Sequence, residues 1–511
     1  MTKDSSKDSL QWAADDEPGS APGNMYLAHA AKHVDLRRIL LILLGLGLFA
    51  AVNWSPDWPD AIDPMGERFD LTREGKAAVG LFLMAAVWWV FEVVPIGVTS
   101  ITVGVIQALF LIRPARTAFS DFMDPSVWFI IGSIVIGMAF SRTGLTKRMA
   151  YKMLVLVGEK TSRIYLGSFV MTALLTLIMA HTAVAAAVFP LLMAIHSLYG
   201  EEGEKTRFGR GLFIGMAFVA GAGSIITLFG AARGAVAVGF FQDITGGEVT
   251  FFGLSYYMAP LGLVMVLILW GLMMVLFKPE RKEITGLRKR AIILNAKLGP
   301  IRREEILTIA IVLLTVATMG LRSFLPALHA IDKSAILLVA AVLFFLFKVL
   351  SIHDLEDIPW NIILLFGGAM SIGLCLWQTG AASWMAVEVI GVLEGDHWVI
   401  FVVGISLFVL IMTNLIMNVA AVAISLPVAL VLAPYLGVAP EVILFASLAA
   451  AGMPFLLLVG AAPNAIAYES RQFTSGQFFV AGIPASIILM IVISVFVVFV
   501  WPLMGMPTVV R

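Results

Sequence analysis

The sequence predicts an all-α polytopic membrane protein with two re-entrant hairpins, arranged as an inverted repeat of two halves. The first observation is composition: 60% of the 511 residues are hydrophobic and only 13% are charged, which is too apolar for a soluble domain. The second is a series of apolar runs of the length that a membrane-spanning helix needs, about 20 residues. The third is an internal sequence repeat.

The internal repeat pairs a stretch from Pro125 to Pro190 with a stretch from Asn361 to Pro427. The residues that recur at an offset of 236 are Gly132, Ile136, Gly137, Thr143, Gly144, Met149 and Ala150, which match Gly368, Ile372, Gly373, Thr379, Gly380, Met385 and Ala386. When the offset is increased by one residue, Ala183, Ala186 and Pro190 recur as Ala420, Ala423 and Pro427. Internal duplication around discontinuous helices is typical of secondary transporters, so a carrier is the leading hypothesis.

The chain begins with residues 1–35, which are polar and acidic, and which we predict to form a disordered cytoplasmic tail. The first repeat half is predicted to span residues 36–277. Arg37 and Arg38 precede its first apolar run, and six basic residues lie in segment 142–163. Because basic residues in short loops mark the cytoplasmic side, both sites are expected inside, and the acidic loop 53–76 is expected outside.

A hairpin is predicted at residues 164–199 of the first half. This segment has 36 apolar-dominated residues, whereas two full crossings need about 40 residues and a polar turn between them. If both flanks, Arg163 and residues 201–210, are cytoplasmic, the segment must enter and leave the membrane on that side without crossing it. The alternative is an ordinary pair of short helices. Residues 278–305, with nine basic and four acidic residues, are predicted to form a cytoplasmic linker between the halves.

The second half, residues 306–511, is expected to contain a matching hairpin at residues 398–433, again 36 residues long, with Met417-Asn418-Val419 near its middle. Counting spans places this hairpin on the outer side and the C-terminus outside. Two hairpins that enter from opposite sides are what an inverted repeat produces. Small residues at Gly221–Ser224 and Gly460–Ala465 predict two further broken helices, with close packing of intact helices as the alternative.

Three polar residues at membrane depth are candidates for function. His181, at the first hairpin tip, is suited to carry a proton or to donate to a substrate oxygen, and equally to be a hydrogen-bonded core histidine. Arg233 is an uncompensated cation in an apolar stretch, which marks a ligand path unless the side chain extends to a surface. Asn418, at the second tip, carries an amide that suits either a cation or an anionic substrate.

Three motifs resemble the divalent anion:sodium symporter (DASS) family, which includes bacterial dicarboxylate, citrate and sulfate carriers. They are Glu92-Val93-Val94-Pro95-Ile96-Gly97-Val98-Thr99, Gly132 through Thr143-Gly144-Leu145 with Arg148 and Ala150, and Pro359-Trp360 leading to Gly367-Gly368. The resemblance covers roughly residues 75–500. It implies about eleven transmembrane helices and a homodimer with an elevator-type cycle, in which segments 36–113 and 306–358 form a scaffold domain. The hairpins, the broken helices and the Gly132 and Gly368 spans would form the transport domain.

The family's signature is a Ser-Asn-Thr triplet at each hairpin tip, ten residues before a proline. Here the triplets read Ala180-His181-Thr182 and Met417-Asn418-Val419, and the later loops read Ala231-Ala232-Arg233-Gly234 and Ala461-Ala462-Pro463-Asn464. The resemblance implies substrate-binding roles for His181, Thr182, Arg233, Asn418, Val419 and Asn464. It implies ion-binding roles for Thr182, Ser224, Thr227, Asn418, Ala462 and Asn464.

These departures bear on the coupling ion. The first tip lacks the Ser and Asn side chains, which removes two oxygen ligands, and hard cations need several. A fixed Arg233 about 5 Å from a sodium ion would oppose its binding by about 3 kcal/mol at an effective dielectric constant of 20. We therefore hypothesise that Arg233 replaces the first sodium ion. Coupling to Na+, coupling to H+ and anion exchange all stay open, and no other cofactor is expected.

The leading function is a secondary active transporter of small divalent anions (dicarboxylate, tricarboxylate, sulfate or sulfonate) in a bacterial inner membrane. The alternative is a cation/proton antiporter or oxyanion permease of the wider ion-transporter superfamily, which we would expect to carry acidic residues at the broken helices. A channel is a third alternative. The sequence supports no enzyme, because no catalytic constellation or metal-ligand cluster can be assembled. Its net charge of zero gives no case for nucleic-acid binding.

Overall fold

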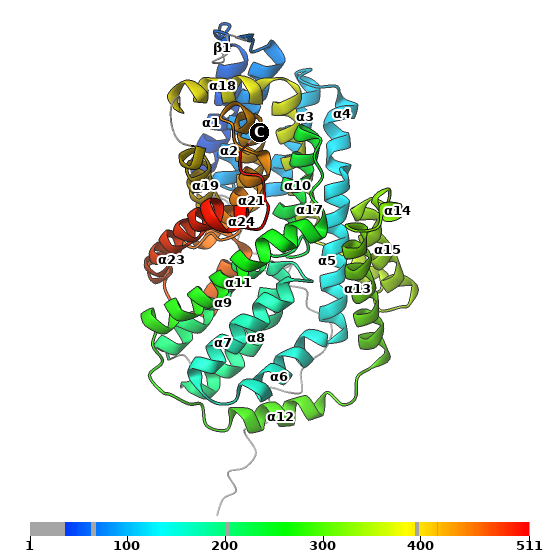
Figure 1. The fold of residues 1–511 in the computed structure, drawn as a ribbon, viewed down its shortest axis with the longest axis vertical. Helices are drawn as coiled ribbons and strands as arrows, with labels where there is room; N and C mark the ends of the chain where they lie inside the picture. Colours follow the sequence, from blue (N-terminus) through cyan, green and yellow to red (C-terminus); the bar gives the residue numbers. More distant parts are fainter. Residues whose placement is uncertain (1–35, 63–67, 201–203, 394–397, 416, 510–511) are drawn as a thin grey trace, which may run out of the picture. The chain divides into compact units, whose positions relative to one another are not determined.

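The computed structural model describes residues 36–62, 68–200, 204–393, 398–415 and 417–509, so the predicted tail, residues 1–35, lies outside the described residues. The chain divides into two compact units, Met1–Leu40 and Leu41–Arg511, and the arrangement below is that of the second unit. The described part is mostly helical (Figure 1), with one antiparallel ribbon of β1 (Ala61–Ile62) and β2 (Arg68–Phe69).

The first half of the chain contains the helices that precede the linker. They are α1 (Leu36–Asn53), α2 (Arg73–Val90), α3 (Ile96–Leu109), α4 (Ala115–Ser120), a 3-10 helix at Asp121–Met123, α5 (Pro125–Thr143), α6 (Leu145–Val157), α7 (Thr161–Thr176), α8 (His181–Tyr199), α9 (Arg207–Gly223), α10 (Ala232–Thr245) and α11 (Phe251–Leu276). The predicted linker contains a helix of its own, α12 (Leu287–Lys297).

The second half repeats this order. It contains α13 (Arg303–Arg322), α14 (Pro326–His329), α15 (Lys333–Leu346), α16 (Ile352–Glu356), α17 (Trp360–Gln378), α18 (Ala381–Leu393), α19 (Trp398–Leu415), α20 (Asn418–Tyr435), α21 (Pro440–Ala451), a 3-10 helix at Leu458–Gly460, α22 (Ala462–Tyr468), α23 (Ser475–Val495), a π-helical turn at Phe496–Val500 and α24 (Trp501–Leu503).

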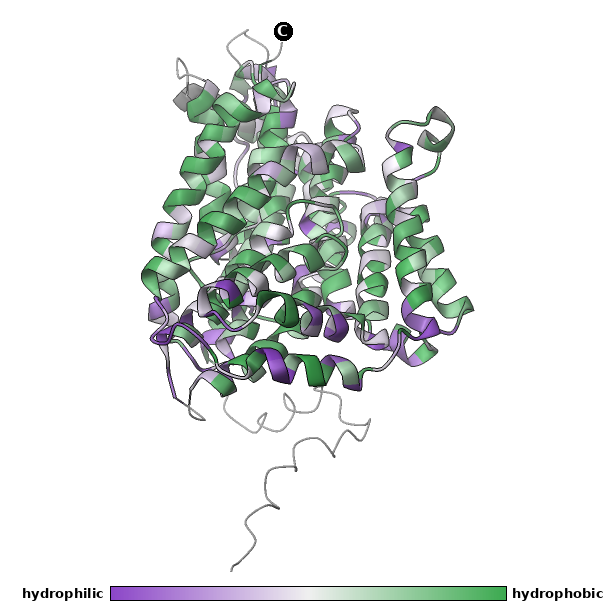
Figure 2. Cartoon of the chain, turned by 60° about the horizontal axis from the view of Figure 1, so that its bottom comes forward, coloured by the Kyte–Doolittle hydropathy of each residue, from purple (hydrophilic) through white to green (hydrophobic). Residues whose placement is uncertain are grey.

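The helices have the hydropathy of membrane spans. Among the described residues, nine are long and apolar enough to cross a membrane, and α3, α15 and α21 are shorter apolar helices. Figure 2 shows hydrophobic residues along most helices, with hydrophilic residues gathered at helix ends and in connecting segments. The hairpin arms α8, α19 and α20 meet the same criterion, which therefore does not separate full spans from hairpin arms. The count of eleven spans stays a prediction.

The repeated glycines mark close approaches between helices of opposite halves. A Cβ built on Gly132 of α5 would lie 2.7 Å from the Cβ of Leu337 in α15, and one built on Gly368 of α17 would lie 2.3 Å from the Cβ of Ser100 in α3. Only glycine permits such approaches. The assignment of α5 and α17 to a transport domain with the hairpins stays a prediction; in the structure they pack closely on α15 and α3, which come from segments predicted to form the scaffold.

Each predicted hairpin is a pair of packed helices. In the first, α7 ends at Thr176 and α8 begins at His181; in the second, α19 ends at Leu415 and α20 begins at Asn418. Both arms of the first pair pack on α9, and both arms of the second pack on α21, so the two halves share one local arrangement. Whether these pairs turn back within a membrane stays a prediction.

The two predicted broken helices are confirmed. One break separates α9 from α10 at residues 224–231, and the other separates α21 from α22 at residues 452–461. Beyond each break, the second piece crosses to the other half: α10 packs on α20, and α22 packs on α8. Each hairpin is therefore packed against helices of both halves.

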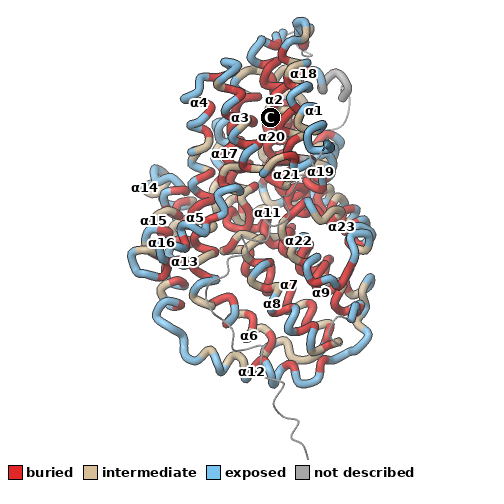
Figure 3. Tube along the Cα trace, turned by 180° about the vertical axis from the view of Figure 1, so that it is seen from behind, coloured by how far each residue is buried: buried red, intermediate tan, exposed pale blue. Residues whose placement is uncertain are grey.

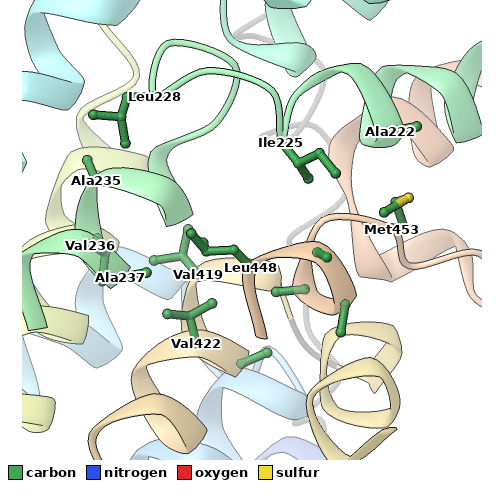
Figure 4. Close-up of a cluster of buried hydrophobic side chains, with 14 of the residues drawn as sticks. Ala222, Ile225, Leu228, Ala235, Val236, Ala237, Val419, Val422, Leu448 and Met453 are labelled. Carbon is green, nitrogen blue, oxygen red and sulfur yellow. The ribbon is translucent and has the colours of Figure 1, made fainter. Parts of the chain in front are cut away.

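The core of the second unit joins these exchanged pieces. Helices α20 and α21 are buried along most of their length (Figure 3). Figure 4 shows a buried cluster contributed by α9, α10, α20, α21 and the two breaks: Ala222, Ile225, Leu228, Ala235, Val236, Ala237, Val419, Val422, Leu448 and Met453. Burying apolar surface from both halves in one cluster couples the folding of one half to that of the other.

Candidate functional site

The first hairpin tip is braced by the break between α9 and α10. The hydroxyl of Thr227 donates to the carbonyl oxygen of Leu177 at 2.8 Å, and the backbone N–H of His181 donates to the carbonyl oxygen of Gly230 at 2.9 Å. Each bond satisfies a backbone group that neither helix can satisfy internally. The Thr227 hydroxyl therefore already has a structural role at the tip.

A cavity of about 300 Å³ lies against this tip. It is lined by α5, by residues 180–186 of the tip and α8, by Leu228 and Ala232, and by residues between Asp357 and Phe366. His181 and Thr182 are both in the wall. The His181 Nδ1 atom is buried and has no protein hydrogen-bond partner among the described residues. An unpaired buried polar atom in a cavity wall marks a place where a ligand or water can bind.

Arg233 lies behind this wall. The side chain is 1% exposed, and its Nη2 donates to the hydroxyl of Ser224 at 2.7 Å, while Nη1 is buried without a partner among the described residues. None of the ion pairs formed by the described residues includes Arg233. Its Nη2 also lies at the C-terminal end of α21, because a Cβ built on Gly452 would be 2.8 Å away. Helix C-termini carry partial negative charge, which favours a cation there.

The second hairpin tip begins at Asn418, which is 5% exposed and whose Nδ2 is buried without a partner among the described residues. The next residue, Val419, points its side chain into the apolar cluster of Figure 4. The Nδ2 group of Asn464 donates hydrogen bonds to the carbonyl oxygens of Pro454 and Leu457, at 2.9 and 3.1 Å. These bonds stabilise the break at residues 452–461. Ala462, a predicted ion-binding residue, is the first residue of α22.

The structure thus gathers only part of the predicted site around one cavity. His181 and Thr182 line it; Ser224 and Arg233 form a pair beside it; Asn418 and Asn464 lie at the second tip and are not in its wall. The sequence reasoning missed Asn414, which is 2% exposed. Its Oδ1 accepts from the N–H groups of Leu456 and Leu457, at 2.7 and 3.3 Å. Its only sequence signal is a polar residue in a long apolar run.

A second, smaller cavity of about 130 Å³ lies at the other end of α5. Its wall contains three carboxylates and one lysine: Asp124, Asp243, Asp332 and Lys333. Phe129 and Leu228 line both cavities, so these two buried side chains belong to the wall that separates them.

Comparisons with known proteins find a family model and curated relatives that match this chain. The family model described as the sodium:sulfate symporter transmembrane region matches residues 67–507. The chain is similar to the sodium-dependent dicarboxylate transporter SdcS of Staphylococcus saprophyticus, with 23% identity over 458 residues that cover 85% of this chain and 87% of that protein. It is similar to SdcS of Staphylococcus aureus, with 25% identity over 455 residues and the same coverage.

Solved transporter structures share the fold. One is Neisseria gonorrhoeae MtrF, from a class of antimetabolite efflux pumps, with a TM-score of 0.56 and 13% identity, covering 92% of this chain and 95% of that chain. Another is the Alcanivorax borkumensis YdaH transporter, with a TM-score of 0.55 and 14% identity, covering 92% and 98%. At these identities the likeness concerns the fold alone.

Proposed function

Because this chain belongs to the sodium:sulfate symporter family, we propose that it is a secondary active transporter of small anions that works by an elevator movement. As a family member it is a membrane transporter and not an enzyme. The observation that carries the proposal is the cavity at the N-terminus of α8, where His181 and Thr182 form part of the wall. An internally duplicated helical fold with a ligand-sized cavity at a helix break is the usual construction of a carrier site.

The paired cavities support alternating access. One cavity extends to Ser141, near the C-terminal end of α5, and the other contains Asp124, which caps its N-terminal end. The 19 residues of α5 span about 28 Å, close to the thickness of a bilayer core. Phe129 and Leu228, which line both cavities, would then close the path between the two sides in this state.

The proposed cargo is a small organic or inorganic anion: a dicarboxylate, a tricarboxylate, sulfate or a sulfonate. The named relatives are dicarboxylate transporters. His181, Thr182 and the N-terminus of α8 would hold an anionic group, and Asn418 and the backbone of Val419 would complete the site from the second tip when the halves move. Asn464, whose amide hydrogens are donated to Pro454 and Leu457, would support that tip. Positive helix ends and oriented N–H donors suit such groups.

For coupling, we propose that a sodium ion binds at the second tip, near Asn418, Ala462 and Asn464. The relatives are named as sodium-dependent. At the first tip two of the three residues expected to bind an ion are engaged in the protein: the Thr227 hydroxyl donates to Leu177, and the Ser224 hydroxyl donates to Gly221 and accepts from the guanidinium of Arg233. Arg233 would take the place of the ion there. Proton coupling is a second candidate, favoured by the unpartnered Nδ1 of His181.

The proposed oligomeric state, membrane and orientation also rest on the membership of the family. We propose a homodimer in a bacterial inner membrane, with the N-terminus in the cytoplasm and the C-terminus outside. The antiporter alternative is disfavoured because no carboxylate among the described residues pairs with Arg233, and none lines the first cavity except Asp357.

The function is tested by uptake into proteoliposomes. The purified full chain would be reconstituted and given radiolabelled succinate, citrate, sulfate or a sulfonate, with sodium or choline outside and at two pH values. Saturable uptake of at least one anion that requires the protein is the expected result. A rate that rises with sodium supports the second-tip ion, whereas a rate that follows only the pH gradient supports proton coupling. Absence of uptake and of counterflow for every anion would refute the proposal.

A further inference from the structure

The geometry of the first cavity points to a cargo with a single anionic head group and an apolar body, rather than to a compact dianion. The inference rests on the proposed function and narrows its substrate class. It is carried by three features of the cavity: the chemistry of its walls, the absence of a positive side chain among the described residues that line it, and the origin of its space.

The walls of the cavity are apolar over most of their area. Side chains of α5 and of the start of α17 supply them, namely Phe129, Ile130, Ile134, Met138, Ile362 and Phe366. Of the polar side chains, Ser133 has already donated its hydroxyl to the carbonyl oxygen of Phe229 at 3.1 Å. An apolar wall gains free energy only by covering apolar surface of the ligand, since a polar surface placed against it loses its hydrogen bonds with water.

The charge of the cavity does not suit two negative groups. Among the described residues that line it there is no lysine or arginine, and its one ionised side chain is the carboxylate of Asp357. Arg233 is not in the wall, and its Nη2 is bound to Ser224. A second anionic group would therefore lie against apolar side chains or near a like charge, and both arrangements are unfavourable.

One head group, in contrast, has partners. The N-terminus of α8 faces the cavity through His181 and Thr182. The hydroxyl of Thr182 and the helix N-terminus together can bind the oxygens of one carboxylate or sulfonate. The rest of the ligand would then extend along α5.

The space for an apolar body comes from one uncovered glycine. Gly137 lines the cavity, and a Cβ built there would meet only Ala183 and Met179, at 3.8 and 3.9 Å. Its repeat partner Gly373 is covered by the ring of Phe240, which a Cβ would approach to 2.3 Å. The same sequence position is thus filled by an aromatic ring in one half and left open in the other. A cavity of about 300 Å³ is at the lower end of the range for organic ligands, about 300–1,000 Å³.

The test compares matched anions on the full chain in proteoliposomes. Benzenesulfonate and hexanesulfonate carry one head group and an apolar body, whereas sulfate and succinate are compact dianions. We expect the two sulfonates to be taken up with half-saturating concentrations at least about tenfold lower than those of the dianions. Preference for sulfate or succinate would overturn this inference and leave the proposed function intact. Uptake of none of the four by folded protein would overturn both.

A cavity-filling series separates specific binding from partitioning into lipid. Gly137→Ala fits the available space, and Gly137→Leu fills the cavity further. We expect half-saturating concentrations for benzenesulfonate to rise in that order, by at least about tenfold for the Leu variant. Gly271→Leu in α11 is the matched control, because a Cβ there would meet no atom within 4 Å. Equal effects of Gly137→Leu and Gly271→Leu, or none from either, would overturn the inference.

Discussion

The guanidinium of Arg233 is hydrogen-bonded to the hydroxyl of Ser224 across a helix break. Ser224 directly follows α9, Arg233 is the second residue of α10, and the Nη2–Oγ distance is 2.7 Å. The same guanidinium lies at the C-terminal end of α21, from the other half. One buried cation therefore lies beside the C-terminal ends of helices from both repeats. The partial negative charge at such helix ends also favours a bound metal ion.

Replacing this cation should change the response to sodium. Arg233→Met keeps much of the side-chain volume and removes the charge, so repulsion of a nearby sodium ion, about 3 kcal/mol at 5 Å and a dielectric constant of 20, is lost. We expect anion uptake in choline to fall at least tenfold and the dependence of the initial rate on sodium to become steeper. Arg163→Met, at an exposed site in α7, is the control. A sodium response identical in Arg233→Met and wild type would contradict the prediction.

Two asparagines near the second tip should separate structural from functional roles. Asn414→Ala leaves the N–H groups of Leu456 and Leu457 without their acceptor, and should lower the free energy of unfolding by about 1–3 kcal/mol. Asn418→Ala removes an Nδ2 that has no protein partner among the described residues, so stability should change little. In the Asn418→Ala variant, the half-saturating concentration of the anion or of sodium should rise at least tenfold. Melting temperature and uptake, measured together, test both; the reverse pattern would show the roles to be exchanged.

The close glycine contacts predict a stability cost for a single methyl group. Gly368→Ala would place a Cβ 2.3 Å from Ser100, and Gly132→Ala would place one 2.7 Å from Leu337. Both variants should lose about 1–3 kcal/mol of stability by overpacking. Gly320→Ala in α13 is the matched control, because its Cβ would meet nothing within 4 Å. Thermal denaturation in detergent measures the difference, and unchanged melting of Gly368→Ala would refute the packing.

Much of the architecture could be predicted from sequence because its signals are local. The hairpin tips are predicted by counting back from the prolines at 190 and 427. In the structure, α8 begins at His181 and α20 begins at Asn418, both within the predicted triplets. The breaks near Ser224 and Asn464 follow from the glycines of the first run and from Gly460 and Pro463 of the second, because glycine and proline weaken a helix. The apolar composition of the runs is enough to predict the helices that could span a membrane.

The site was less predictable because it depends on contacts between distant segments. Nothing in the sequence shows that the Thr227 hydroxyl donates to the carbonyl oxygen of Leu177 and so is held in place at the first tip. Nor does the repeat distinguish Gly137 from Gly373, although only the second is covered by Phe240. Equivalent residues in a duplicated chain acquire different neighbours, and the neighbours decide whether a cavity forms.

A buried ion pair holds the helix that precedes the first hairpin. Arg148 of α6 donates from Nε and Nη2 to the two carboxylate oxygens of Glu305 in α13, at 2.9 and 3.0 Å, and also to the carbonyl oxygens of Gly299 and Pro300. Arg148→Met leaves Glu305, which is 3% exposed, without this partner, and should cost about 3–5 kcal/mol. Glu356→Gln is the control, because Glu356 and its partner His353 are 68% and 79% exposed and such pairs contribute about 0–1 kcal/mol. Equal losses of melting temperature would refute the difference.

The acidic residue at the start of the linker should make stability depend on pH. Glu280 accepts hydrogen bonds from the Tyr199 hydroxyl and from the backbone N–H groups of Arg207 and Phe208, which are orphan donors at the start of α9. Burial tends to raise the pKa of Glu280, but these hydrogen bonds outweigh it and lower that pKa below its ordinary value. A carboxyl group whose pKa is lower in the folded state stabilises the fold above its unfolded pKa, and the contribution is lost as pH falls through the folded pKa.

Glu280→Gln should therefore melt at a lower temperature than wild type at pH 7, and the gap should narrow as the pH is lowered below the ordinary glutamate value of about 4.3. The substitution keeps the shape of the side chain and removes only its charge, so the pH dependence of the gap reports on the carboxylate. Glu304→Gln, at an exposed site of the same linker, is the matched control and should show no such gap. A gap of constant size from pH 7 to about pH 3, well below the ordinary glutamate value, would mean that Glu280 stabilises α9 by its shape and not by its charge.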